Sequence, residues 1–266
     1  MAIPIWSREK MEKLTVVKVG GAIVEDEAGL RRLLVDFAAI HGHKILVHGG
    51  GRRATKVAAS LGIESQMVNG RRVTDAAMLE VVTMVYGGLV NKNIVAKLQA
   101  MGVNALGLTG ADMDVIRSHR RPLKDGVDFG FVGDVDKVDG QRLQTLVEQG
   151  VTPVMAPLTH DGEGNILNTN ADTIASETAK ALAPFYDVTL VFSFEKPGVL
   201  RNPEDDGSLI REITREDFLR YVADGTVSGG MIPKIENALQ AVAAGVRQVN
   251  ITLATAIDGR HGTFIR

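Results

Sequence analysis

The sequence predicts an α/β protein: a three-layer αβα sandwich around a mostly parallel, open sheet, with two lobes that share one continuous sheet. Short apolar runs alternate with patterns of helical spacing along most of the 266 residues, which is typical of a parallel sheet covered by helices on both faces. At 28.5 kDa the chain is long enough for one large domain or two closely packed lobes. No internal repeat, low-complexity tract or flexible linker separates the lobes, so we expect one sheet to run through both.

The first part of the chain alternates predicted strands with predicted helices. The strands are short apolar runs, and the helices carry apolar residues three and four positions apart. Asp75 is a suitable N-cap for a long helix that ends near Gly102. In chain order, the expected elements are a strand followed by glycines in Leu14–Gly21, a helix at Ala28–Ile40, a strand followed by glycines in Lys44–Gly51, a helix at Arg52–Leu61, the long helix, and a strand at Val103–Leu108.

The next segment has a different pattern. In Val115–Val138, charged residues alternate with Ile and Phe around Gly126 and Gly130, which predicts hairpins that cover a ligand. The α/β alternation then resumes, and Pro184 ends a helix and marks the boundary between lobes 1–184 and 185–266. In order, we expect a strand at Val151–Leu158, a turn at Asp161–Asn165, a helix from Asn170 or Asp172 to Leu182, a strand at Val188–Phe192, helices at Arg215–Ala223 and Met231–Ala244, and a strand at Val249–Leu253.

Composition restricts the partners of this protein. The formal net charge is −2 and no basic run dominates, which argues against a nucleic-acid or anionic-membrane partner. The absence of cysteine excludes disulfides, thiolate metal ligands and cysteine nucleophiles. No apolar stretch reaches membrane-spanning length, and Met1–Lys10 lacks the apolar centre of a secretory signal. We therefore expect a cytoplasmic protein.

Several common catalytic motifs are missing. The chain has no G-x-x-x-x-G-K-[ST] and no G-x-G-x-x-G after a strand, which argues against a P-loop site and a nicotinamide dinucleotide site. It also lacks H-E-x-x-H and G-x-S-x-G, the commonest zinc-hydrolase and serine-hydrolase signals. What remains is an uncommon arrangement of glycines and cations.

Two predicted strands end in glycine clusters, and the first carries a lysine. Lys18-Val-Gly-Gly21 and His48-Gly-Gly-Gly51 lie side by side if their strands are neighbours. Lys18 stands among valines, where an unpaired ammonium is costly to bury, so it should face an anion. Bare amides beside a fixed cation are typical of a phosphate site. Taken singly, the glycines are equally well explained by tight turns, and a strand-end His48 is more often a structural donor than a catalyst.

Two later segments each have two interpretations. Asn69-Gly-Arg-Arg-Val-Thr74 is a predicted loop with adjacent arginines, which either face solvent or bind a substrate carboxylate through both arms of one guanidinium. Asn168-Thr-Asn-Ala-Asp172 is either a capped helix start or a binding segment. In the second case Asn168 bonds a substrate amide or carboxylate, and Asp172 orients a lysine.

A third cluster lies near the C-terminus, in Ser228-Gly-Gly-Met-Ile-Pro-Lys-Ile-Glu-Asn237. Gly229 and Gly230 precede a predicted helix, and Lys234 lies near its start. A lysine near the positive end of a helix is electrostatically unfavourable, so Lys234 should have an anionic partner. A solvated lysine is the alternative.

Together these segments resemble the amino acid kinase family, and within it the branch that phosphorylates N-acetyl-L-glutamate in arginine biosynthesis. The resemblance covers nearly the whole chain from Leu14 onward. It rests on five motifs in order: Lys18-Val-Gly-Gly, His48-Gly-Gly-Gly, Asn69-Gly-Arg-Arg-Val-Thr, Asn168-Thr-Asn-Ala-Asp and Gly230-Met-Ile-Pro-Lys.

The resemblance implies a role for each matching residue. Lys18 and Lys234 would stabilise the transferring phosphoryl group, and Asp172 would organise them. The positions that bind the acylated glutamate are matched by Gly50, Gly51, Arg72 and Asn168. The phosphates and the adenine nucleotide would contact Gly20, Gly21, Glu195, Lys196, Pro197, Gly198, Val199, Leu200, Thr226, Val227 and Ser228.

The chain departs from the family pattern in two places. It has Ser193-Phe-Glu-Lys-Pro-Gly-Val-Leu200, whereas the family commonly has a Thr-Asp or Ser-Asp pair before Val-Pro-Gly-Val-Leu. Arg71 stands where many relatives have an uncharged residue.

The implied activity is ATP-dependent phosphorylation of the side-chain carboxylate of N-acetyl-L-glutamate to an acyl phosphate, the second step of arginine biosynthesis. Mg²⁺ would be held mainly by nucleotide phosphates and water, so no protein metal cage is expected. Residues 1–184 would bind the acyl-glutamate and dimerise, and residues 185–266 would bind ATP. Arginine-inhibited hexameric relatives carry a longer N-terminal helix than the residues before Glu12 provide, which favours a homodimer.

Three alternatives remain open. The first is another kinase of the same fold group, acting on aspartate, glutamate, carbamate, uridylate or a carrier-bound aminoadipate. The second is the same reaction on N-succinyl-L-glutamate, for which Arg71 or Lys92 would supply an additional cation. The third is an amino-acid-binding or interaction protein on the same scaffold, which the presence of both lysines and Asp172 disfavours.

Overall fold

An eight-stranded sheet forms the centre of the computed structural model, which describes residues 11–68, 70–123 and 126–266. Its strands are β1 (Lys13–Val19), β2 (His43–His48), β5 (Ala105–Leu108), β8 (Thr152–Met155), β11 (Asp187–Phe194), β12 (Glu212–Ile213), β13 (Gln248–Leu253) and β14 (Thr263–Ile265). The strand order is β12-β14-β13-β11-β1-β2-β8-β5, and only β13 and β14 pair antiparallel. The expected mostly parallel sheet, continuous through both parts of the chain, is confirmed.

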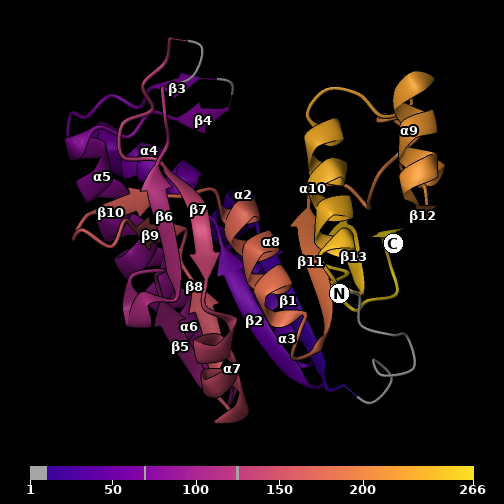
Figure 1. The fold of residues 1–266 in the computed structure, drawn as a ribbon, viewed down its shortest axis with the longest axis horizontal. Helices are drawn as coiled ribbons and strands as arrows, with labels where there is room; N and C mark the ends of the chain where they lie inside the picture. The colour runs from indigo at the N-terminus through magenta and orange to yellow at the C-terminus, as the bar shows by residue number, and fades with distance from the viewer. Residues whose placement is uncertain (1–10, 69, 124–125) are drawn as a thin grey trace.

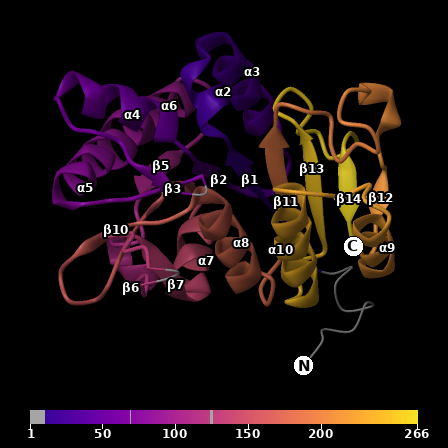
Figure 2. The same ribbon diagram turned by 90° about the horizontal axis from the view of Figure 1, so that it is seen from above.

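Helices cover both faces of this sheet, as seen from above in Figure 2. One layer contains α2 (Gly21–Glu25), α3 (Glu27–Ala38), α4 (Gly51–Ser60), α5 (Ala76–Val82), the π-helix η1 (Thr83–Val90) and α6 (Asn91–Gln99). The other contains α7 (Gly140–Glu148), α8 (Ala171–Leu182), α9 (Arg215–Ala223) and α10 (Met231–Ala243). The three-layer αβα architecture is therefore confirmed.

The alternation of side chains along β1 divides the core into two clusters. Leu14 and Val16 pack with the layer of α7 to α10, and Val17 and Val19 pack with the opposite layer. Successive side chains of a strand point to opposite faces, so Lys18 lies on the same face as Val16, towards α8 and α10. This parity decides which helices meet the lysine.

Two smaller sheets lie beside the central one (Figure 1). A four-stranded sheet has the order β10-β9-β6-β7, made of β6 (Ile116–Arg120), β7 (Gly133–Val138), β9 (Leu158–His160) and β10 (Ile166–Asn168). Strands β6 and β7 pair antiparallel, so the hairpin expected within Val115–Val138 is present. The third sheet pairs β3 (Met67–Val68) with β4 (Arg71–Arg72). The short helices η2 (Asp112–Asp114) and η3 (Asp206–Ser208) complete the fold.

Three expectations for the local structure need correction. The long helix after Asp75 is continuous, but its centre is the π-helix η1 rather than α-helix. The strand expected at Val151–Leu158 is two strands in different sheets, because Pro157 lacks the N–H that a continuous ladder requires. Arg71 and Arg72 form a strand of a small hairpin rather than a loop.

Other boundaries differ less. The first strand ends at Val19 and is followed by Gly20 and Gly21, as predicted, and a helix begins at Gly21. Asn170, not Asp172, caps α8: its side-chain oxygen accepts from the backbone N–H groups of Asp172 and Thr173 at 2.8 and 3.1 Å. Met1–Lys10 and Asn69 lie outside the described residues. Within the described ranges, no helix combines the length and apolar character that crossing a bilayer requires.

Candidate active site

The two glycine turns meet at the carboxyl ends of β1 and β2. The strands are parallel neighbours, with Lys18 beside Val47 and Val19 beside His48. A Cβ at Gly21 would lie 3.5 Å from the backbone nitrogens of both Gly50 and Gly51, so the two turns approach backbone to backbone. A Cβ at Gly49 would lie only 3.1 Å from the backbone nitrogen of Gly21, so the close approach favours glycine there and leaves two sets of peptide N–H groups close together.

A buried histidine fixes the second turn. His48 is 0% exposed, and its Nδ1 donates to the carbonyl of Gly49 at 2.9 Å. Its Nε2 accepts from the amide of Asn91 at 3.1 Å, and the same amide donates to the carbonyl of Val154 at 2.9 Å. Burial lowers the pKa of His48 to about 4, so the ring is neutral at physiological pH. His48 is therefore a structural donor here, which is the more common role of a histidine at a strand end.

The two lysines predicted to serve one phosphoryl group line one pocket. Lys18 projects from β1, and its Nζ lies 2.8 Å from Asp172 Oδ1 in an ion pair without the alignment of a hydrogen bond. Lys234 reaches the same space from the first turn of α10. Both ammonium groups lie over the ring of Phe194, with Nζ-to-centroid distances of 5.9 Å for Lys18 and 4.2 Å for Lys234.

Charge and burial act together on Lys234. Burial is the largest cause that lowers the pKa of this amine. The negative charge of Asp172 raises the pKa, and the positive charge of Lys18 lowers it. Lys18 and Lys234 share the lining of this pocket, and Asp172 borders it through its ion pair with Lys18.

The predicted nucleotide residues are only partly gathered in this pocket. Its lining includes Gly20, Gly21, Glu195, Lys196 and Gly198. Within the segment after β11, Val199 and Leu200 are instead core residues, 2% and 8% exposed, and Pro197 does not line the pocket. Thr226, Val227 and Ser228 lie in the connection between α9 and α10, also outside the lining.

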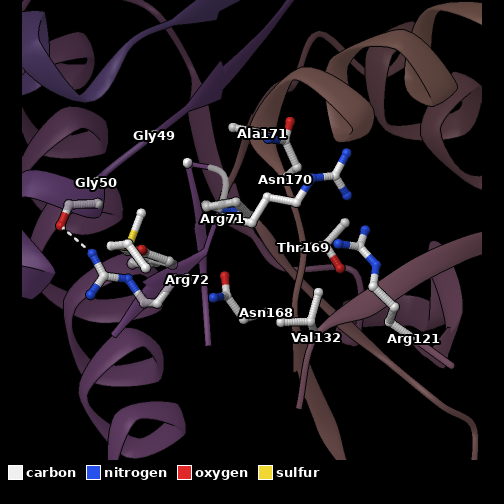
Figure 3. Close-up of a pocket in the computed structure, with 15 residues that line it drawn as sticks. Gly49, Gly50, Arg71, Arg72, Arg121, Val132, Asn168, Thr169, Asn170 and Ala171 are labelled. Atoms are coloured by element: carbon white, nitrogen blue, oxygen red, sulfur yellow. Dashed lines mark hydrogen bonds between the residues drawn. The ribbon is translucent and has the colours of Figure 1, made fainter. Parts of the chain in front are cut away.

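A second pocket adjoins the glycine turns (Figure 3). All four residues expected to bind the acylated glutamate line it: Gly50, Gly51, Arg72 and Asn168. Gly51 lines both pockets, so the two are contiguous. The Asn168 amide donates to Thr74 Oγ1 at 2.9 Å, which holds the Asn168 side chain at the pocket wall.

Arg72 is 9% exposed, and its guanidinium is held by the protein itself. It donates to the hydroxyls of Ser65 and Thr55 at 2.9 and 2.7 Å, and to the carbonyl of Gly51 at 3.0 Å. In Figure 3 this side chain points towards the glycine turn. A substrate carboxylate at Arg72 would therefore be held beside the amides of that turn.

Several residues of the two pockets have no distinctive signal in the sequence, among them an arginine and two aromatic residues. Arg121 is 12% exposed and donates to Asp134 from Nε and Nη2, and its guanidinium lines the second pocket beside Arg71 (Figure 3). Tyr86 also lines that pocket, and Phe194 lines the first. Their local signals are ordinary: an arginine in a charged segment and aromatic residues in apolar runs. The excess of arginine in Val115–Val138 is the one signal that could have drawn attention to Arg121.

Across residues 11–68, 70–123 and 126–266, no group of three or more His, Asp or Glu side chains could hold a metal ion. The site instead offers ammonium groups and peptide N–H groups, which suit phosphate oxygens.

Comparisons with known proteins find relatives that match nearly the whole chain. The model of the amino acid kinase family matches residues 13–252. A protein of Bacteroides thetaiotaomicron called acetylglutamate kinase is 71% identical over 255 residues, which cover 96% of this chain and 99% of that protein. The protein of that name from Bacteroides fragilis strain ATCC 25285 is 68% identical over 260 residues, 97% of this chain and 99% of its own. A solved structure from Streptococcus mutans UA159 superimposes with a TM-score of 0.77 at 30% identity, over 95% of this chain and 98% of its own.

Proposed function

Because this chain belongs to the amino acid kinase family, we propose that it transfers the γ-phosphoryl group of ATP to the side-chain carboxylate of N-acetyl-L-glutamate. The product is an acyl phosphate, and the reaction is a step of arginine biosynthesis. The contiguity of the two pockets carries the proposal: one holds Lys18 and Lys234, the other holds Arg72 and Asn168, and Gly51 lines both. The chain is a kinase rather than a binding protein on the same scaffold, since its close relatives are kinases.

The site supplies what this chemistry needs. A glutamate carboxylate, with a reference pKa of about 4.3, is already ionised at neutral pH and needs no general base. The main task is to bring two anions together and stabilise charge on the transferring group. Lys18 and Lys234 would flank that group, and the N–H groups of the two glycine turns would face its oxygens. Asp172 would keep Lys18 oriented through their 2.8 Å ion pair.

We propose that ATP and Mg²⁺ bind in the first pocket. We infer that ATP lies over the carboxyl ends of β1 and β11, with residues 185–266 providing most of its contacts and residues 1–184 binding the acyl-glutamate. Mg²⁺ would be held by phosphate oxygens and water, since the donor set of the pocket is mostly cationic. The metal would neutralise part of the phosphate charge, and the residues that line the pocket would orient the ATP–Mg²⁺ complex.

A cytoplasmic homodimer is the assembly we propose. Exposed apolar side chains on η1 support it, because Met84 and Leu89 are 54% and 41% exposed. Such residues on one helix favour a second copy as partner. Size-exclusion chromatography with light scattering checks this, and a monomer at all concentrations would contradict it.

Alanine variants of the two lysines test the proposed activity. With ATP, Mg²⁺ and N-acetyl-L-glutamate, acyl phosphate is trapped as the hydroxamate. We expect Lys18→Ala and Lys234→Ala each to reduce kcat by about 10²–10³, the typical loss for a preorganised charge stabiliser. Lys56→Ala is the control, because Lys56 is an exposed lysine paired with Glu25. Normal turnover in both active-site variants, with intact folding, would contradict the proposal.

N-succinyl-L-glutamate is a second candidate substrate, favoured by Arg71 and Arg121. Both guanidinium groups line the acyl-glutamate pocket near Thr169 and Asn170, apart from Arg72 (Figure 3). A succinyl group adds a third carboxylate, which this pair of cations would bind. Lys92, the other cation considered, donates to the Gly107 carbonyl and does not line the pocket.

Initial rates with the two acyl-glutamates separate these candidates. If the succinyl compound is the substrate, Arg71→Gln raises its KM by about tenfold and leaves the KM of the acetyl compound unchanged. If the substitution changes neither KM value, Arg71 does not bind the succinyl carboxylate. If the wild-type protein prefers the acetyl compound, N-succinyl-L-glutamate is not its substrate.

A further inference from the structure

The ring of Phe194 is shared by two ammonium groups. Phe194 is the last residue of β11 and lines the same pocket as Lys18 and Lys234. Lys234 Nζ lies 4.2 Å from the ring centroid, and Lys18 Nζ lies 5.9 Å from it. Both distances are within the range of about 6 Å in which a cation is attracted by an aromatic face.

The strand register explains this meeting. Lys18 pairs with Phe192 across the β1–β11 ladder, and side chains two residues apart share a face. Phe194 therefore lies one step beyond Lys18 towards the carboxyl ends of the strands, on the face covered by α8 and α10. The start of α10 brings Lys234 to the ring from above that face.

Two ammonium groups in one pocket repel each other, and one carboxylate only partly offsets this. Asp172 forms its ion pair with Lys18. In the described part of the chain, Lys234 has no carboxylate within ion-pair distance. An aromatic face supplies diffuse negative charge without a competing carboxylate that would also repel ATP phosphates.

We propose that Phe194 is a positioning residue for phosphoryl transfer, whose ring face holds Lys234, and more weakly Lys18, charged and directed at the same part of the nucleotide pocket. The role in transfer rests on the proposed kinase function. The hold of the ring on Lys234 is a property of the free protein and can be measured without turnover. Leucine at this position would keep the apolar contact and remove the negative face.

Other charged groups of the pocket have partners of their own. Arg52 of α4 lies 3.4 Å from Glu195, and Lys196 lies 3.4 Å from Asp206. These exposed pairs are screened by solvent and weak. Together with Lys18 and Asp172, these two pairs are the charged groups that line or border the pocket around Lys234 in the described part of the chain.

The experiment compares Phe194→Leu and Phe194→Tyr with the wild-type protein. The first measurement is the pH dependence of Lys234 acetylation by acetic anhydride in the free protein, read by peptide mass. The second is the pH profile of kcat/KM for ATP, which reports groups of the free enzyme. We expect Phe194→Leu to lower the pKa of Lys234 by roughly one pH unit and kcat by about tenfold, and Phe194→Tyr to stay close to wild type.

A neighbouring ring provides the matched control. Phe192 lies on the same strand and face, with its centroid 6.2 Å from that of Phe194, and it is buried in the core. Phe192→Leu should lower the melting temperature without moving the Lys234 titration. Difluorophenylalanine at position 194 weakens the ring face at nearly constant shape, and should lower the pKa of Lys234 even if Phe194→Leu folds poorly.

The proposal is overturned if the Lys234 titration is the same in Phe194→Leu, in the fluorinated protein and in the wild type, or if Phe194→Tyr behaves like Phe194→Leu. Absence of acyl phosphate formation by the wild-type protein would instead refute the kinase proposal, and the labelling result would still decide whether the ring holds Lys234.

Discussion

Acidification should destabilise this protein through one buried imidazole. His48 is completely buried, donates to the Gly49 carbonyl and accepts from the Asn91 amide. A second ring proton would meet the amide N–H of Asn91. That amide would have to turn and give up its bond to the Val154 carbonyl, so the folded state resists protonation of His48.

The magnitude follows from the pKa difference. The pKa of His48 is lowered from 6.5 to about 4 by burial. Between these values the unfolded chain binds a proton that the folded protein does not, so the free energy of unfolding decreases as pH falls. The slope approaches about 1.4 kcal/mol per pH unit, and roughly 3 kcal/mol is lost between pH 6.5 and 4. Above about pH 7.5 the ring is almost entirely neutral in both states and contributes little pH dependence.

Urea denaturation at several pH values between 7 and 4.5 measures this effect. The comparison uses His48→Gln, which keeps a hydrogen-bonding side chain but cannot be protonated. Carboxylates contribute equally to the pH dependence of the free energy of unfolding in both proteins. The variant should lack only the contribution of His48, whatever its stability at pH 7. His261→Gln serves as control because His261 is 62% exposed. Parallel curves for the wild-type protein and His48→Gln across this range would refute the reasoning.

Three further substitutions test other parts of the site. Arg72→Lys should raise the KM for the acyl-glutamate by about tenfold and change kcat less, because an ammonium cannot reproduce the forked contacts of the guanidinium. An unchanged KM in steady-state kinetics would show that Arg72 does not bind the substrate carboxylate. Gly50→Ala places a Cβ 2.8 Å from the Tyr86 ring and should raise the same KM by about tenfold or more, whereas Gly88→Ala meets nothing within 4 Å and should not. Asn170→Ala removes the cap of α8 and should lower the free energy of unfolding by about 1 kcal/mol in urea titrations; no loss would show that the cap is dispensable.

The fold and several site residues could be predicted from the sequence because their signals are local. Apolar runs, helical spacing and glycine after strands depend on residues near one another in the chain. Period-two alternation of β1 already indicates that Lys18 shares a face with Val16, and its burial cost indicates an anionic partner. The ion pair with Asp172 is consistent with that expectation.

Local signals failed where a long-range contact decides the structure. Apolar spacing cannot distinguish α-helix from the π-helix at Thr83–Val90, since both present an apolar face to the core. The run Val151–Leu158 contains prolines at positions 153 and 157, and the sequence does not show which of them ends the strand. Only the separate pairing of β8 and β9 shows that the chain changes sheets at Pro157 and not at Pro153. In the segment after β11, Gly198 lines the nucleotide pocket and Val199 lies in the core. The Val199 N–H donates to Thr263 Oγ1, a long-range contact that the chain order does not reveal.

The sequence by itself determined the architecture of this protein and the identity of its cationic and glycine-rich segments, since hydrophobic periodicity and backbone freedom act over a few residues. Only the tertiary structure decided that Arg121 enters the acyl-glutamate pocket, that Tyr86 confines Gly50, and that one aromatic ring lies beneath both lysines. These contacts join segments separated by long stretches of chain. They exist because the strand order and crossovers of the folded sheet bring those segments to one edge.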